Sequence, residues 1–60
     1  MSQLALNELE GVYDALAAAI NQVGTDKESL FLTKLVLLLA NRLGDQAQVE
    51  QAIATALCDL

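Results

Sequence analysis

The segment between Gly24 and Gly44 limits the fold most strongly, because it is apolar around most of its circumference. On a helical wheel, five of its apolar side chains form one wide stripe, and four more lie beside or opposite that stripe. A helix that buries a single face needs an apolar arc of only about 100–120°. We therefore expect other helices to surround this segment. The wide stripe contains Leu32, Leu35, Val36, Leu39 and Leu43, and the further apolar residues are Leu30, Phe31, Leu37 and Leu38.

Two glycines divide the chain into three segments, each with helical periodicity. Gly24 and Gly44 each follow a helical pattern and precede a candidate N-cap, which is where C′ glycines are found. A capping residue with a Glu or Gln three positions later predicts the start of a helix. The predicted caps and their partners are Asn7 with Glu10, Thr25 with Glu28, and Asp45 with Gln48.

These signals predict an all-α fold of three short helices at about 8–22, 26–43 and 46–57, packed as a small bundle. Residues 1–60 are expected to form a single domain, with residues 1–6 as a loose N-terminal arm. A chain of this length buries only about 60% of the surface of its unfolded form, yet 55% of its residues are apolar. We therefore expect dimerisation through the central helix to complete the bundle. The alternative is a compact monomer whose surplus leucines are partly exposed.

The surplus apolar side chains of the central helix predict an oligomer interface. Leu30 and Leu37 lie almost opposite the wide stripe, and Lys34 and Asn41 occupy the gap beside them. These two polar residues can form a small polar pocket, or they can lie at a helix interface, where a single Asn fixes register. Asn41 can equally satisfy loop carbonyls near Gly44. The predicted interface consists of Leu30, Phe31, Lys34, Leu37, Leu38 and Asn41.

The charge and hydropathy pattern argue against several kinds of partner. Eight carboxylates oppose three basic residues, which gives a net charge of −5 and disfavours binding to nucleic acid or anionic lipid. The longest apolar run, residues 35–40, is too short for a bilayer crossing, which needs about 20 apolar residues. Residues 1–7 contain no basic signal-peptide region. We expect a cytoplasmic protein that binds neither nucleic acid nor membrane.

A pair of carboxylates provides the strongest candidate for site chemistry. Glu10 and Asp14 lie four residues apart on one helical face, a spacing that can hold a metal ion or perturb one acid by the other. Antiparallel packing of the first two helices would place Arg42 near them. The favoured interpretation is therefore a weak ion pair with Arg42.

The remaining reactive side chains lack the partners that catalysis requires. The chain has no histidine and one cysteine, so no zinc or iron–sulfur ligand set and no cofactor are expected. Cys58 lies near a helix C-terminus beside Asp59, which does not favour a thiolate. We expect no catalytic residue, no metal ion and no enzymatic activity. The other side chains considered and set aside as nucleophiles are Ser29, Thr33 and Tyr13.

The stretch Leu35 to Asp45 resembles the signature of a family of short, uncharacterised bacterial proteins of unknown function. That signature is a leucine-rich helix ending in Ala-Asn-x-x-Gly-Asp, matched here by residues 40–41 and 44–45, followed by a short amphipathic helix. The upstream Tyr13-Asp14-Ala15-Leu16 matches an aromatic residue and an Ala-Leu pair in the same family. The resemblance implies a small helical domain. It brings no catalytic or binding residues with it.

Three functions remain, and none is enzymatic. The first is a small oligomeric helical protein, a homodimer, that mediates protein–protein interaction with a larger protein partner. The alternative is a binding module that holds a small hydrophobic ligand between helices. The third is an acidic antagonist of a nucleic-acid-binding protein, which rests on the charge of −5 alone.

Overall fold

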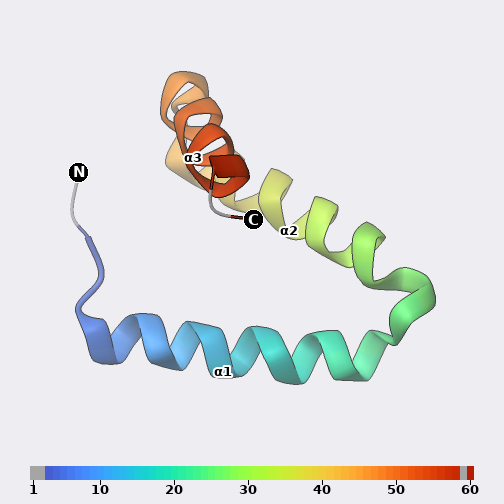
Figure 1. Cartoon of the computed structure of the whole chain (residues 1–60). Coiled ribbons are helices and arrows are strands. Elements are labelled where there is room, and N and C mark those ends of the chain that lie inside the picture. The colour runs from blue at the N-terminus through green and yellow to red at the C-terminus, as the bar shows by residue number, and fades with distance from the viewer. Residues whose placement is uncertain (1–2, 59) are drawn as a thin grey trace.

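The computed structural model describes residues 3–58 and 60 and is helical along most of that length (Figure 1). Helix α1 covers Leu6–Val23, a 3₁₀ turn η1 covers Thr25–Lys27, α2 covers Glu28–Leu43 and α3 covers Gln46–Cys58. The described part of the chain contains no strand. The all-α class and the three helices are confirmed, and the predicted helix ends agree with the observed ones to within two residues.

The start of α1 differs from the predicted cap. The helix begins at Leu6 and its N-cap is Ala5, whose backbone N–H donates to Oε1 of Glu8 at 3.0 Å. This is the half of a capping box that requires no side chain on the N-cap residue. The predicted cap at Asn7 is therefore wrong, because Asn7 already lies in the helix. Within the described residues, the predicted arm of residues 1–6 shortens to 3–5, and residues 1–2 lie outside the described part.

The joint between α1 and α2 is formed by backbone groups. Gly24 has φ 81° and ψ 169°, and its N–H donates to the carbonyl of Ile20 at 3.1 Å. The N–H of Lys27 then donates to the carbonyl of Gly24 at 3.3 Å, which closes η1. No side chain caps η1 or α2. The predicted Thr25–Glu28 capping box is therefore wrong, because the 3₁₀ turn occupies the positions of the box and α2 starts only at Glu28.

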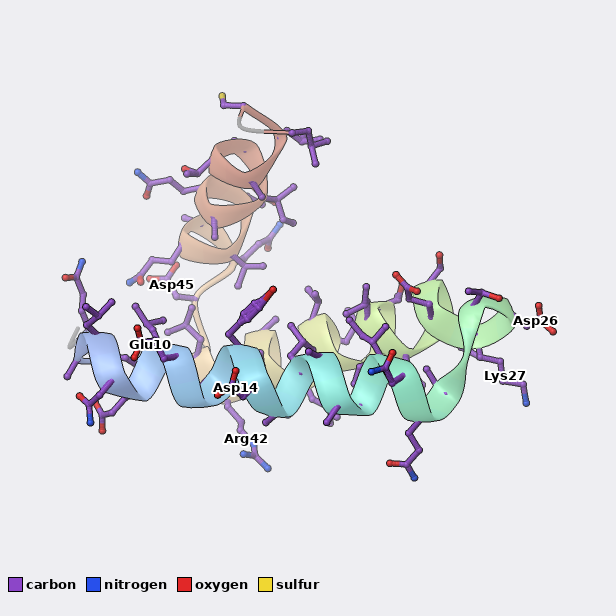
Figure 2. The ribbon with its side chains drawn as sticks, turned by 60° about the horizontal axis from the view of Figure 1, so that its bottom comes forward. Glu10, Asp14, Asp26, Lys27, Arg42 and Asp45 are labelled. Carbon is purple, nitrogen blue, oxygen red and sulfur yellow. The ribbon has the colours of Figure 1, made fainter. Side chains whose placement is uncertain are left out.

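The corner between α2 and α3 is fixed by backbone and side-chain groups together. Gly44 is left-handed, with φ 72° and ψ 25°, and its N–H donates to the carbonyl of Ala40 at 2.9 Å. Oδ1 of Asp45 accepts from the backbone N–H of Gln48 at 3.1 Å, and its Oδ2 accepts from Nε2 of Gln48 at 3.0 Å. The predicted cap at Asp45 is confirmed. Figure 2 shows Asp45 at this corner, far from Asp26 and Lys27 at the other joint.

The three helices form an open arrangement. From the joint, α1 and α2 diverge as the two arms of a V, and α3 turns away at the far end of α2 (Figure 1). No two described residues twelve or more positions apart have Cα atoms within 8 Å. The radius of gyration is 12.6 Å, whereas a compact domain of this length has about 10.4 Å. The predicted bundle packing is thus not present within the single chain.

The contact between α1 and α2 is confined to the region of the joint. There, Ile20 and Val23 of α1 and Phe31 and Leu35 of α2 are half-buried. None of the described side chains is fully buried. The helices are therefore specified by local hydrogen bonds and by this small apolar contact, without a closed core.

Candidate interaction surface

Exposed apolar side chains occur on all three helices and constitute the main functional feature of the described chain. A lone surface leucine needs no explanation, but contiguous apolar patches mark sites of interaction. Here the patches follow the same stripes that would form a core in a closed bundle. The large apolar residues left exposed on the helices are Leu6, Leu9, Val12, Tyr13, Leu30, Val36, Leu37, Leu38, Leu39, Leu43, Ile53 and Leu57.

The solvent-accessible area shows how much surface the single chain leaves uncovered. The chain exposes 5450 Å². A compact monomer of 6.4 kDa would expose only about 3,800 Å², so the excess is about 1,650 Å². An excess of this size is comparable to the total area buried in a standard protein–protein interface, about 1,600 Å².

The structure brings four of the six predicted interface residues together. Leu30, Phe31, Lys34 and Leu38 line an open groove of about 410 Å³ beside the α1–α2 joint, which we call the joint groove. The rest of its lining is Val23, Lys27 and Leu35.

The other two predicted interface residues lie elsewhere on α2. Leu37 is 64% exposed and does not line the joint groove. Asn41 is exposed and lines a shallow hollow next to Gly44 and Asp45. The proposed polar pocket of Lys34 with Asn41 is therefore not formed, because the two residues line different hollows.

A second groove, which the sequence did not predict as exposed, lies between α2 and α3. It has a volume of about 330 Å³, and we call it the corner groove. Val36 and Leu39, assigned from the sequence to the covered stripe of the central helix, remain 45% and 55% exposed here. At these two residues only α3 lies beside the stripe, whereas α1 contacts the stripe near the joint, at Leu35. The groove is lined by Val36, Leu39, Ala40, Leu43, Gln48, Val49, Ala52, Ile53 and Ala56.

Gln48 is the polar residue in the lining of the corner groove. Its backbone N–H and its Nε2 both donate to the carboxylate of Asp45, which orients the side chain. Its Oε1 is buried and has no hydrogen-bond partner among the described atoms. The cap at Asp45 therefore both starts α3 and fixes one wall of the groove.

The N-terminal half of α1 carries an apolar stripe that touches neither groove. Leu6, Leu9, Val12 and Tyr13 are each at least 52% exposed, and we call them the free α1 stripe. They continue the stripe whose C-terminal part, including Ile20, packs at the joint. The helical periodicity of this segment is the sequence signal for the stripe, but periodicity does not show whether such a stripe is covered.

The predicted ion pair between α1 and Arg42 is not made. Figure 2 shows Glu10 and Asp14 on α1 and Arg42 on α2, and Figure 1 shows that the two helices diverge toward this end. No contact within 4.0 Å joins Arg42 to either carboxylate. The reason is the open V, which removes the antiparallel packing that the ion pair requires.

The charges are nevertheless separated between elements. Helix α1 contains Glu8, Glu10 and Asp14 and no basic residue. All three basic residues of the chain, Lys27, Lys34 and Arg42, lie in η1 and α2. The first helix is thus acidic, and the second carries the positive charge.

The groups considered for catalysis are distributed over the three helices. Tyr13 is on α1, Ser29 and Thr33 are on α2, and Cys58 is exposed at the end of α3. Among the described residues, no three potential metal ligands of the Cys, Asp or Glu type gather at one place. The described residues form apolar grooves on α2 and at its two ends.

The fold and these surfaces define a class of small, open, all-helical protein with uncovered apolar grooves. The chain belongs to the family described as Protein of unknown function (DUF2783), which matches residues 2–57. The resemblance to a family of unknown function is thereby confirmed. Comparisons with curated proteins and with solved structures found no match. No helix in the described part of the chain has the length and apolar character needed to cross a membrane.

Proposed function

We propose that this chain is a small, non-enzymatic helical protein that self-associates and mediates protein–protein interaction in the cytoplasm. The observation that supports this proposal is the excess of exposed surface, about 1,650 Å² for each chain relative to a compact monomer. A chain that hides so little apolar area gains stability chiefly by covering it with another protein. The scattered positions of Tyr13, Ser29 and Cys58 support a role in binding rather than catalysis.

A homodimer is the assembly that best accounts for this area. Two chains covering their excess would bury about 3,300 Å² in total, which falls among obligate homodimer interfaces of roughly 2,000–5,000 Å². Two-fold dimers are also the commonest oligomers. The six predicted residues on α2, four of which line the joint groove, form one proposed contact surface of this dimer.

The net charge of the chain indicates what kind of larger protein the dimer binds. The chain carries a net charge of −5, which favours encounter with a basic protein surface and disfavours nucleic acid. The carboxylates of α1 are the group that such a surface would meet first, because no basic residue of that helix offsets them.

The experiment is a mass measurement of the full chain by sedimentation equilibrium over a wide concentration range. We expect twice the chain mass of 6.4 kDa. Leu37→Asp should weaken the dimer, because it places a charge in the α2 contact. Gln51→Asp, on an exposed polar position of α3, adds the same charge as a control. A folded monomer at every concentration contradicts self-association, and a Leu37→Asp dimer of unchanged affinity removes this face from the interface.

A second candidate function rests on the corner groove. Its lining is apolar apart from Gln48, and its volume of about 330 Å³ lies at the lower end of the range for ligand sites, about 300–1,000 Å³. A small hydrophobic ligand would therefore fit. Native mass spectrometry of the purified protein tests this candidate: a retained extra mass that is lost on denaturation favours it, and the bare chain mass contradicts it.

A further inference from the structure

Two apolar surfaces of this chain have no cover: the free α1 stripe, on one side of a helix, and the corner groove, a hollow lined by residues of two helices. We propose that the free α1 stripe of one chain docks into the corner groove of a second copy, so that two chains exchange their first helices. The inference rests on the proposed self-association and adds to its α2 contact surface a second contact, between α1 of one chain and the corner groove of the other.

The two surfaces match in length. The free α1 stripe runs from Leu6 to Tyr13, and the α2 wall of the corner groove runs from Val36 to Leu43. Each spans seven residue steps, which is about 10 Å along a helix at 1.5 Å per residue. The docking of an apolar helix face into a groove between two helices is a common mode of recognition.

The charges also match. The acidic residues Glu10 and Asp14 lie on α1 beside the stripe, and Arg42 lies on the same half of α2 as the corner groove. Within one chain these groups do not meet, because the V is open. A second chain's α1 in the groove would bring carboxylates to the positive helix. Exposed ion pairs contribute little to affinity, so this match sets the orientation of the docked helix rather than its strength.

The second copy accounts for both surfaces at once, which is why we prefer it to other occupants. The joint holds the chain's own α1 away from the groove, through Gly24, η1 and the contact of Ile20 and Val23 with α2. A foreign helix or a small ligand would fill the groove but leave the free α1 stripe exposed. Reciprocal exchange about a two-fold axis covers two stripes and two grooves in one closed assembly.

The composition of the chain supplies a direct test by nuclear magnetic resonance. Tyr13 is the one tyrosine, and Ile20 and Ile53 are the two isoleucines, of which Ile53 lines the corner groove. In a mixed dimer of methyl-labelled and unlabelled chains, we expect an intermolecular Overhauser effect between the ring of Tyr13 and the methyl group of Ile53. If the effect occurs only within a single chain, the chain's own α1 fills the groove. That result overturns the exchange.

Disulfide trapping provides a second measurement on the same contact. In a Cys58→Ser background, we expect the double variant Leu9→Cys with Ile53→Cys to oxidise to a covalent dimer. Asn7→Cys with Ile53→Cys is the matched control, because Asn7 lies on the opposite side of α1 from Leu9 and should not cross-link. A covalently closed monomer, or a dimer formed equally well by the control, contradicts the proposal.

Charge substitutions separate this inference from the proposed function. Leu9→Asp should weaken dimerisation by about 100-fold or more, since a two-fold dimer contains the change twice. Asn7→Asp adds the same charge two residues away and should leave the dimer unchanged. A monomeric native chain refutes both self-association and exchange. A native dimer that Leu9→Asp does not weaken, and that shows no contact of Tyr13 with Ile53, refutes the exchange alone.

Discussion

The two turns of this chain differ in the groups that fix them. At the α2–α3 corner, a left-handed glycine and a side-chain cap act together, and both oxygens of Asp45 are engaged by Gln48. At the α1–α2 joint, a glycine and a 3₁₀ turn act without a side-chain cap, and the helices are held by a few half-buried apolar residues.

This difference bears on function, because each turn determines a different surface. The corner sets the relative position of α2 and α3, and with it the shape of the corner groove. The joint sets the angle of α1, which carries the free stripe outward. A well-fixed groove and a projecting helix are the two parts that an exchanged dimer requires. The predictions below test each turn separately, from the largest expected effect to the smallest.

Substitution of Gly24 should show the largest effect, and Gly44, the other turn glycine, provides the comparison. Gly24 has φ 81° with ψ 169°, a region open essentially to glycine alone, so Gly24→Ala should lower the free energy of unfolding by about 1–3 kcal/mol. Gly44 is in the left-handed helical region, which Asn tolerates, so Gly44→Asn should lower it by only a few tenths of a kcal/mol. Urea unfolding at one fixed protein concentration measures both. Equal losses for the two variants would contradict the assigned difference.

Removal of the cap at the corner should produce the next largest effect. Asp45→Ala deletes the acceptor for both the backbone N–H and Nε2 of Gln48, and should lower stability by about 1 kcal/mol. Asp45→Asn keeps a carbonyl acceptor and should lower it by less. Circular dichroism during thermal unfolding follows the change. An Asp45→Ala variant as stable as the native chain would show that the corner does not depend on its cap.

A change within α1 that leaves both turns intact should raise stability. Gly11 lies inside α1, and a Cβ added there meets nothing within 4 Å. Gly11→Ala should therefore increase the free energy of unfolding by about 0.5–1 kcal/mol, because alanine loses less backbone entropy in a helix. The same urea experiment measures the gain. A decrease in the free energy of unfolding would instead indicate that Gly11 lies in close contact with a second chain.

The smallest expected effect concerns the start of α1. Glu8 accepts the backbone N–H of the N-cap Ala5 at 3.0 Å in an exposed position. Glu8→Ala should lower stability by a few tenths of a kcal/mol, because water replaces the lost acceptor. The fractional helicity measured by circular dichroism should fall slightly. A loss of stability as large as that of Asp45→Ala would show that the starts of α1 and α3 are equally constrained.

The sequence predicted most of the local features of this fold, although two of the three predicted helix caps were wrong. Gly24 and Gly44 ended helices, and Asp45 with Gln48 began one, because backbone geometry and short-range hydrogen bonds decide these features. The start of α1 was misplaced because a carboxylate at the third helical position can bind the N–H of any residue. Ala5 serves as N-cap without having a capping side chain.

The arrangement of the helices could not be predicted in the same way. Periodicity shows which side of a helix is apolar, but it does not show which neighbour covers that side. Val36 and Leu39 were assigned to a covered stripe, and they lie half open in the corner groove. Leu30 and Leu37 were assigned to an oligomer interface, and in the single chain they are 60% and 64% exposed. Which of these two stripes is covered depends on contacts with residues far away in the sequence or in another chain. Helical periodicity does not reveal such contacts.

No side chain in the described part of the chain is fully buried, and this has a calorimetric consequence. The heat capacity of unfolding follows the apolar surface newly exposed to water, and a typical compact domain of this length has about 0.7–0.9 kcal/mol/K. A lone chain that already exposes Val12, Leu39 and Ile53 to solvent has less apolar surface left to hydrate. Its unfolding should therefore be broad, with a small heat-capacity increment. The heat-capacity increment per chain should rise with protein concentration as the apolar stripes become covered. The folded state therefore unfolds with the cooperativity of a globular protein only when it is associated with another chain.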